Sequence, residues 1–180
     1  MTIPADHPKI KPAKIGVILA NLGTPDATDY WSMRKYLSQF LSDKRVVDYS
    51  AWLWQPLLQG IILTRRPFSS GKAYRSIWNN ELNESPLLTT TRLQANAVKK
   101  EVEKIYGNDV IVDFAMRYGN PSTESVIKNL KDQGVEKIVF FPLYPQYAGP
   151  TTATANDEAF RTLMKMNWQP SIRTVAAYFD

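Results

Sequence analysis

The stretch IGVILAN, at residues 15–21, is a nearly continuous run of apolar residues, rich in β-branched side chains. Similar runs follow at residues 110–116 (VIVDFAM) and 137–143 (KIVFFPL), and a fourth, SIRTVAAY, spans residues 171–178. Strands that are covered on both faces have this unbroken apolar character, whereas half-exposed strands alternate. The four runs therefore predict the buried strands of a parallel sheet.

Apolar residues recur at helical spacing between these runs. They form three sets: Met33, Leu37, Phe40 and Leu41; Ala95, Val98, Val102 and Ile105; Val126, Ile127 and Leu130. Gly107 and Gly134 follow the second and third sets as C-terminal caps do, and Asn120 with Pro121 predicts the N-cap and first residue of the third helix. A last helix is expected over residues 152–166. Strands alternating with helices predict an α/β fold with a Rossmann-like parallel sheet flanked by helices.

Length and composition fit one globular domain. The 180 residues are 44% hydrophobic and 22% charged, as in ordinary soluble proteins. Residues 1–13 are polar and rich in proline and lysine, which predicts a flexible tail ahead of a domain at 14–180 and no secretory signal. The most apolar stretch, residues 51–63, is too short to span a bilayer and contains Pro56.

The net charge indicates which partners the protein could bind, and the absence of cysteine bears on its compartment and on metal sites. The formal net charge of +5 suits an anionic partner, such as a carboxylated small molecule or an anionic lipid surface. The basic residues are scattered, so nucleic acid is not expected. The chain has no cysteine, which indicates a cytoplasmic setting. With His7 as the one histidine, in the polar tail, no transition-metal site is predicted.

Ligands of open α/β sheets lie beyond the carboxyl ends of the strands, which selects three loops here. They are residues 22–25 (LGTP), 117–120 (RYGN) and 144–147 (YPQY). The first loop has a single glycine, so it matches neither a dinucleotide motif nor a P-loop. A plain turn into a helix capped by Asp26 or Thr28 is the favoured interpretation of this loop.

Aromatic and cationic side chains gather at the other two loops. Arg117 and Tyr118, with Tyr144 and Tyr147, describe a pocket wall of flat rings and one forked cation. Such a wall suits a large planar ligand that carries carboxylates. The alternative for Arg117 is an ordinary ion pair.

A second apolar surface precedes two arginines. Residues 51–63 hold more apolar side chains than one helix face can bury, and Arg65 and Arg66 follow directly. The segment 51–68 is therefore expected to form an apolar lip edged by cations. Such a lip would contact a flat carboxylated ligand or a membrane surface. A buried helix hairpin is the alternative.

Together these segments resemble the ferrochelatase family. The resemblance extends from residue 14 to about residue 165, in the family's order. It is carried by ILANLGTP at 18–25, RRP at 65–67 with Ser70, Tyr74 and Ile77, SPL at 85–87 with Gln94, FAMRYG at 114–119, and PLYPQY at 142–147 with Thr151 and Thr152.

The resemblance implies one lobe of a two-lobed chelatase fold, with a porphyrin held between the lobes. It implies insertion of ferrous iron into protoporphyrin IX or coproporphyrin III in haem biosynthesis. Fe²⁺ would be a substrate, and no cofactor is expected. Positions that match the family's porphyrin-binding segments are Leu22, Arg65, Arg66, Ser85, Gln94, Arg117, Tyr118 and Tyr144.

One departure from the family pattern sets an expectation about activity. The family's metal-side histidine lies in a short Ser-x-His-x-aliphatic-Pro motif of the second lobe, and a glutamate further on assists it. Neither occurs before Asp180. The resemblance therefore implies that this chain supplies the porphyrin-binding N-terminal lobe, holds no catalytic residue and is inactive without the C-terminal lobe.

Three alternatives stay open. A stand-alone tetrapyrrole-binding module would bind without chemistry. A nucleotide-binding Rossmann enzyme would need a glycine-rich first turn, which Gly23 alone does not provide. A cobalt-inserting relative would be expected to bring histidines that this chain lacks.

Overall fold

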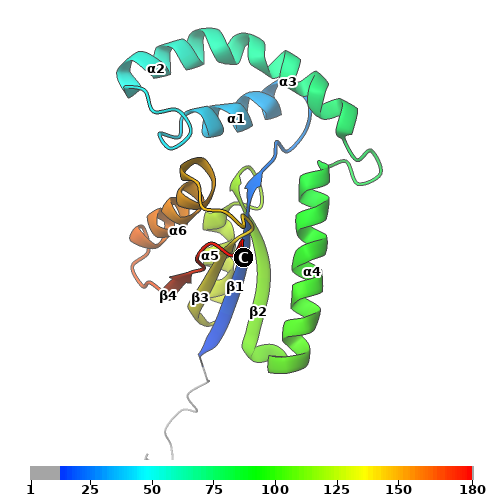
Figure 1. Cartoon of the computed structure of the whole chain (residues 1–180), viewed down its shortest axis with the longest axis vertical. Coiled ribbons are helices and arrows are strands. Elements are labelled where there is room, and N and C mark those ends of the chain that lie inside the picture. Colours follow the sequence, from blue (N-terminus) through cyan, green and yellow to red (C-terminus); the bar gives the residue numbers. More distant parts are fainter. Residues whose placement is uncertain (1–12, 180) are drawn as a thin grey trace, which may run out of the picture.

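The computed structural model describes residues 13–179 and contains one four-stranded sheet. Its strands are β1 (Lys14–Gly23), β2 (Val110–Tyr118), β3 (Val135–Pro142) and β4 (Ser171–Thr174). Their order is β2-β1-β3-β4, and every neighbouring pair is parallel. The expected α/β fold is confirmed (Figure 1). The predictions for the N-terminal tail and for His7 lie outside the described residues.

The fourth strand is shorter than predicted. Only residues 171–174 pair with β3, and the predicted strand ran on to residue 178. After one further hydrogen bond, from Val175 N to Phe140 O at 3.0 Å, the chain leaves the sheet. The ring of Tyr178 then packs on Phe141, with centroids 5.0 Å apart. Packing of this aromatic pair therefore replaces further strand pairing.

Six α-helices connect and cover the strands. They are α1 (Tyr30–Leu41), α2 (Ala51–Leu57), α3 (Leu63–Ile77), α4 (Pro86–Tyr106), α5 (Thr123–Asp132) and α6 (Thr154–Met164). A π-helical turn at Leu58–Ile62 joins α2 to α3, and another at Gly149–Ala153 precedes α6. The joined α2 and α3 form a long arch above α1, beyond the carboxyl ends of the strands (Figure 1).

Two predicted helix starts were wrong. Helix α5 is capped by Ser122, whose Oγ accepts from Ser125 N at 3.1 Å, and not by Asn120. The carbonyl of Pro121 accepts from Met116 N at 2.7 Å, so this residue still belongs to the sheet edge. Helix α1 is capped by Asp29, whose Oδ1 accepts from the backbone N of residues 31 and 32.

Asp26, one of the caps expected for the first helix, is engaged elsewhere. Its carboxylate accepts from Asn120 Nδ2 at 2.8 Å and pairs with Lys35 Nζ at 3.2 Å. It therefore links the loops that follow β1 and β2. Thr28, the other expected cap, is not the N-cap of α1 either.

The apolar core has two parts. The first lies between the sheet and helices α5 and α6, and includes the predicted inward set Val126, Ile127 and Leu130. The second lies beneath the arch, where Met33 and Leu37 of α1 meet residues of the arch and Tyr118 of β2. Tyr118 therefore connects the helical arch to the sheet.

The long helix α4 is packed differently from the prediction. Of the predicted inward set only Ala95 is buried, together with Thr91. Val98 is 36% exposed and Ile105 71% exposed. The helical spacing was right and Gly107 does end the helix, with φ 58°. However, Val102 is only half-buried, so the expected inner face is covered only in part by the described residues.

Two glycines allow the ends of β1 and β2 to touch. Gly23 has φ +103°, and a Cβ there would lie 1.8 Å from Tyr118 O. Gly119 has φ +82°, and a Cβ there would lie 2.3 Å from Thr24 O. Side chains other than hydrogen are excluded at both positions, by the backbone angle and by the neighbouring carbonyl.

Gly119→Ala is expected to lower the free energy of unfolding by about 3 kcal/mol, because left-handed strain and a backbone clash add. Gly134→Ala is the matched control. That glycine also has positive φ, +86°, but a Cβ there would meet no atom within 4 Å, so the loss should be about 1 kcal/mol. Urea unfolding followed by circular dichroism measures both. Equal losses would contradict the close approach of the two loops.

Candidate functional site

The carboxyl ends of β1, β2 and β3 meet at one edge of the sheet, beneath the arch. Because β1 pairs in parallel with both neighbours, Leu22, Arg117 and Tyr144 all lie at this edge. Three of the predicted ligand-binding positions are thus brought together. Leu22 is partly buried and packs against the apolar core beneath the arch.

A buried carboxylate, Asp43, is the centre of the polar contacts at this edge. It follows α1, and its Oδ2 accepts from Arg117 Nη2 at 2.6 Å and Tyr118 OH at 2.9 Å. It also accepts from Thr154 Oγ1 at the start of α6. One carboxylate oxygen therefore joins α1, β2 and α6.

Arg117 is held by a second carboxylate as well. Its Nη1 lies 3.3 Å from Glu158 Oε2, and its Nε donates to Thr154 Oγ1 at 2.7 Å. The Arg117 side chain is only 11% exposed. A ligand carboxylate at this guanidinium would compete with Asp43 and Glu158.

The network fixes the charge of Asp43. Burial alone would raise its pKa, but hydrogen bonds from Thr154, the Arg45 backbone and Tyr118, together with the charge of Arg117, lower it below its ordinary value of 3.8. Asp43 is therefore ionised at neutral pH. It balances the charge of Arg117 in a place that water reaches poorly.

The phenols at the same edge are neutral. Burial raises the pKa of Tyr118 to about 12, and burial also raises the pKa of Tyr144 and of Tyr36. The Tyr118 ring is fully buried, with Phe40 edge-on at 5.2 Å and the Arg117 guanidinium 4.4 Å above it. The Tyr144 hydroxyl is buried and makes no hydrogen bond to the described residues.

Ser85 directly precedes α4 as its N-cap, and Gln94 lies within the helix. The Oγ of Ser85 caps this helix by accepting from Leu88 N at 3.2 Å, and the residue is 2% exposed. Gln94 is exposed more than two turns further along. The structure gives Ser85 a capping role, and among the described residues neither side chain forms a hydrogen bond with the strand ends.

The predicted lip corresponds to the arch of α2 and α3. Leu58 and Leu63 point into the core, whereas five large apolar side chains of residues 51–68 are exposed: Trp52, Leu53, Leu57, Ile61 and Phe68. Arg65 and Arg66 are exposed on α3 and form no ion pair with the described residues. The expected apolar surface edged by two cations is therefore present.

Two recesses adjoin the site. An apolar recess of about 370 Å³ lies beside the arch and is lined by Tyr49, Ser50, Leu53, Trp54 and Leu57. A polar recess of about 550 Å³ adjoins the Asp43 network, with Lys44, Arg45 and Arg161 on its walls. Arg45 pairs there with Asp157 of α6, Nε to Oδ2, at 2.5 Å.

Sequence reasoning missed Asp43, Thr154 and Glu158. They lie in a loop and in α6, more than 100 residues apart, and no motif marks them. The one available signal was that a buried arginine at a strand end needs a carboxylate partner. That signal does not identify which carboxylate.

Metal-binding clusters and membrane-spanning helices are both missing from the described residues. Within residues 13–179 no group of three or more histidine, aspartate or glutamate side chains is placed to hold a metal ion. In the same part of the chain, none of the helices has the length and apolar character needed to cross a membrane.

Comparison with known proteins gives a consistent result. The family model described as Ferrochelatase matches residues 14–180. The ferrochelatase of Rhodobacter capsulatus is 62% identical over 177 residues, which are 98% of this chain and 50% of that protein. The ferrochelatase of Agrobacterium fabrum is 57% identical over 178 residues, 99% of this chain and 51% of that protein. The chain spans about half the length of the curated relatives it matches.

Asp43→Asn is expected to destabilise the fold by about 3 kcal/mol at pH 7, because it leaves the buried Arg117 without its closest partner. The pKa of Asp43 is lower in the folded state, so its contribution is present above the unfolded pKa and is lost as pH falls through the folded pKa. Urea unfolding between pH 2 and pH 7 should therefore show a weaker acid dependence in the variant.

The matched control is Glu101→Gln, which removes an exposed pair with Lys104. This change should cost less than about 0.5 kcal/mol at every pH. Identical pH profiles for the Asp43 variant and the unmodified chain would contradict the role of Asp43.

Proposed function

The chain belongs to the ferrochelatase family, and on that basis we propose that it supplies the porphyrin-binding half of an enzyme that inserts ferrous iron into a porphyrin. The observation that carries the proposal is the exposed apolar arch with Arg65 and Arg66, above the strand ends at Leu22 and Tyr144. Protoporphyrin IX and coproporphyrin III are the candidate substrates, and haem biosynthesis is the proposed role.

A porphyrin is a flat apolar ring with carboxylates at its edge, and the arch offers matching groups. Apolar side chains such as Ile61 and Phe68 would cover a face of the ring. Arg65 and Arg66 would bind propionates, which is supported by their exposure and by the absence of ion partners among the described residues. Leu22 and the neutral phenol of Tyr144 would line the pocket at the strand ends.

In the conformation described, Arg117 and Tyr118 would position other groups of the site and would not contact the ligand directly. Both are bound to Asp43, so they hold the arch and the strand ends in a fixed relation. We retain them as porphyrin-binding positions in the proposal, because they lie at the same edge as Leu22. Ser85 and Gln94 are retained on the resemblance alone.

Metal insertion replaces two pyrrole protons by one Fe²⁺, so a base must accept the protons and ligands must replace the water on iron. The groups at this edge suit neither task. Tyr118 and Tyr144 have raised pKa values, and Asp43 has a lowered pKa and three donors on one oxygen. We propose that residues of the remaining half of the full-length protein perform both tasks.

The proposed location is the cytoplasm, with peripheral contact to a membrane surface through residues 51–68. The absence of cysteine supports the first part, and the exposed apolar side chains beside two arginines support the second. A porphyrin partitions into lipid, so contact of the arch with a membrane would bring the ligand close to the exposed Arg65 and Arg66. The same surface would then serve both membrane contact and ligand entry.

Replacing both Arg65 and Arg66 by alanine is expected to weaken binding of a dicarboxylic porphyrin by about tenfold, because two charge-assisted contacts are lost. Quenching of tryptophan fluorescence measures the dissociation constant. The control is the exposed pair Lys99 and Lys100 of α4, replaced together by alanine, which removes the same charge away from the arch. Equal weakening by both double variants would indicate a general charge effect instead of propionate binding.

The 180-residue chain is expected to bind porphyrin without inserting iron at an enzymatic rate. Anaerobic incubation with ferrous iron and a dicarboxylic porphyrin, followed by absorbance, measures insertion. Turnover comparable to that of a full-length relative, retained in His7→Ala, would show that the base lies within this chain. Binding without turnover, unchanged when the remaining half of a relative is added, would favour a stand-alone binding module.

A further inference from the structure

The two faces of the sheet are covered unequally. On the face that packs against α5 and α6, Ile18, Ala20 and Phe140 are at most 1% exposed. On the opposite face, Val17, Val139 and Phe141 are only half-buried. Parallel sheets are normally covered on both faces, so the second face is incomplete.

Helix α4 covers only part of this second face. Thr91 Oγ1 accepts from Asn21 Nδ2 at 3.0 Å, which places α4 on the side of β1 that Asn21 shares with Val17. Val17 pairs with Val139, so that residue of β3 faces the same side. In Figure 1, α4 runs beside β2, away from β3 and β4.

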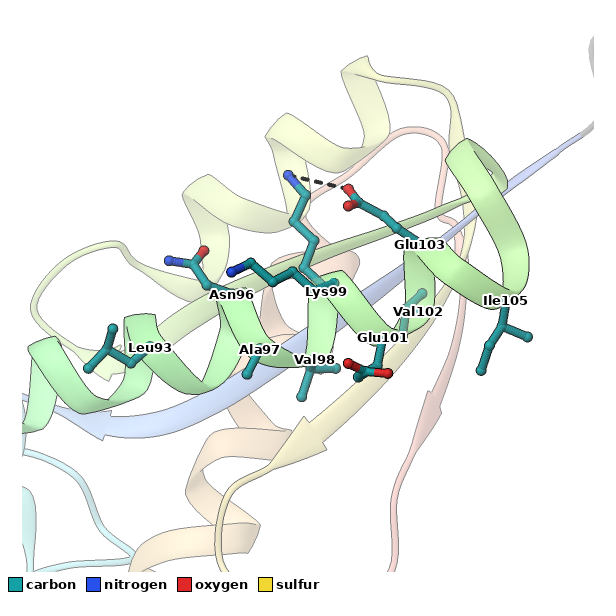
Figure 2. A pocket seen from close by; sticks show the side chains of 10 residues that line it. Leu93, Asn96, Ala97, Val98, Lys99, Glu101, Val102, Glu103 and Ile105 are labelled. Carbon is teal, nitrogen blue, oxygen red and sulfur yellow. Dashed lines mark ion pairs between the residues drawn. The ribbon is translucent and has the colours of Figure 1, made fainter.

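The helix itself has an apolar surface without a described partner. Only two of its 21 residues are buried, whereas α5 buries four of its 10. Leu93 is 63% exposed and Ile105 71% exposed. A shallow depression of about 850 Å³ runs along residues 93–105, where Ala97, Val98 and Ile105 project in the same direction, with the carboxylate of Glu101 between them (Figure 2).

The last described residues also lie on this side of the sheet. Phe141 pairs with Leu19, on the α4 side of β1, and Tyr178 packs against its ring at a tilt of 43°. The Tyr178 backbone N donates to Pro145 O at 2.9 Å. A polypeptide continuing beyond this point would start next to the incompletely covered face.

We propose that the α4 side of the sheet is the surface on which the other half of the full-length protein packs. We define this α4 surface as Leu93, Ala97, Val98 and Ile105 of the helix together with Val139 and Phe141 of β3. The relatives are about twice as long as this chain, so they contain a further half that is available to cover such a surface. An apolar surface of this kind is a contact site.

The covalent link between the two halves favours the other half, over a second copy of this chain, as the partner that covers the α4 surface. A segment joined to the chain near Tyr178 has a high effective concentration at the α4 surface, whereas a second copy must bind from solution. The surface lies away from the arch, so it is an inter-lobe contact distinct from the proposed porphyrin site. The inference needs the full-length protein of the proposed function, but it predicts nothing about porphyrin or iron.

The absence of native cysteine provides the test. Single-cysteine variants Val98→Cys and Ile105→Cys report on the α4 surface, and Asn129→Cys on the exposed side of α5 is the control. Each is placed in the 180-residue chain and in a chimera that joins Asp180 to the remaining half of the Rhodobacter capsulatus relative, with the cysteines of that half replaced by serine. Maleimide labelling rates are compared.

Labelling at positions 98 and 105 should slow by at least about tenfold in the chimera, and labelling at position 129 should change by less than about twofold. Unchanged rates at 98 and 105 in a folded chimera overturn the proposal. Slowing that arises in the 180-residue chain alone as its concentration rises identifies a second copy as the occupant, and also overturns it.

Ile127→Cys, in the core, reports whether the chimera folds, because Ile127 is 0% exposed. If that cysteine labels rapidly, the remaining half is instead produced as a separate chain and added to the 180-residue variants. Slower labelling at positions 98 and 105 then supports the proposal, and unchanged labelling at saturating concentration overturns it. Since no readout involves porphyrin, failure here is distinct from failure of the proposed function.

Discussion

The contact of Asp43 with Arg117, Tyr118 and Thr154 is the interaction on which the arrangement of this lobe depends. Helix α1 and the arch form an insertion between β1 and α4. They are joined to the sheet by the buried ring of Tyr118 and by this carboxylate, and two further hydrogen bonds support the contact, from Tyr36 OH to Gly23 O and from Gly119 N to Gln39 Oε1. An ion pair with both side chains about nine-tenths buried requires nearly complete hydrogen bonding, so it tolerates only one relative position of arch and sheet.

The same network determines which arginines of the lobe are free to bind a ligand. The cation nearest to the strand ends, Arg117, is neutralised by Asp43 and Glu158, whereas Arg65 and Arg66 are exposed on the arch. Binding of a ligand carboxylate is therefore favoured at the arch, beside Arg65 and Arg66, and disfavoured at the strand ends, beside Arg117. The phenols at the strand ends are neutral, and the carboxylate there is engaged by three donors, so none of these groups is suited to accept a proton. In the proposed function such a surface would orient a macrocycle without deprotonating it.

Sequence patterns predicted the strands because burial on both faces leaves a continuous apolar run, and three of the four runs coincide closely with strands. Patterns of helical spacing were reliable for α5, whose apolar stripe faces the core. They failed for α4, because Val98 and Ile105 are apolar without being buried in this lobe. The partners of Asp43 could not be predicted, because hydrogen bonds and ion pairs between residues distant in sequence leave no periodic pattern. The helix starts depended on one or two side-chain hydrogen bonds, at Ser122 and Asp29, and the neighbouring residues Asn120, Asp26 and Thr28 are also of types that cap helices.

The failure at α4 and the success at α5 have a common cause. Apolar spacing records every surface that a helix buries in the complete protein, whichever part of the polypeptide covers it. A helix whose pattern exceeds its burial in the described residues therefore indicates a missing contact, provided that the helix is otherwise well formed. Helix α4 meets this condition, because it has a serine cap, a proline at its first position and a glycine at its end. Its Ala95 side is buried against the sheet, while Leu93 and Ile105 remain in solvent. The exposed apolar residues of α4 are thus accounted for by the proposed contact with the other half of the full-length protein.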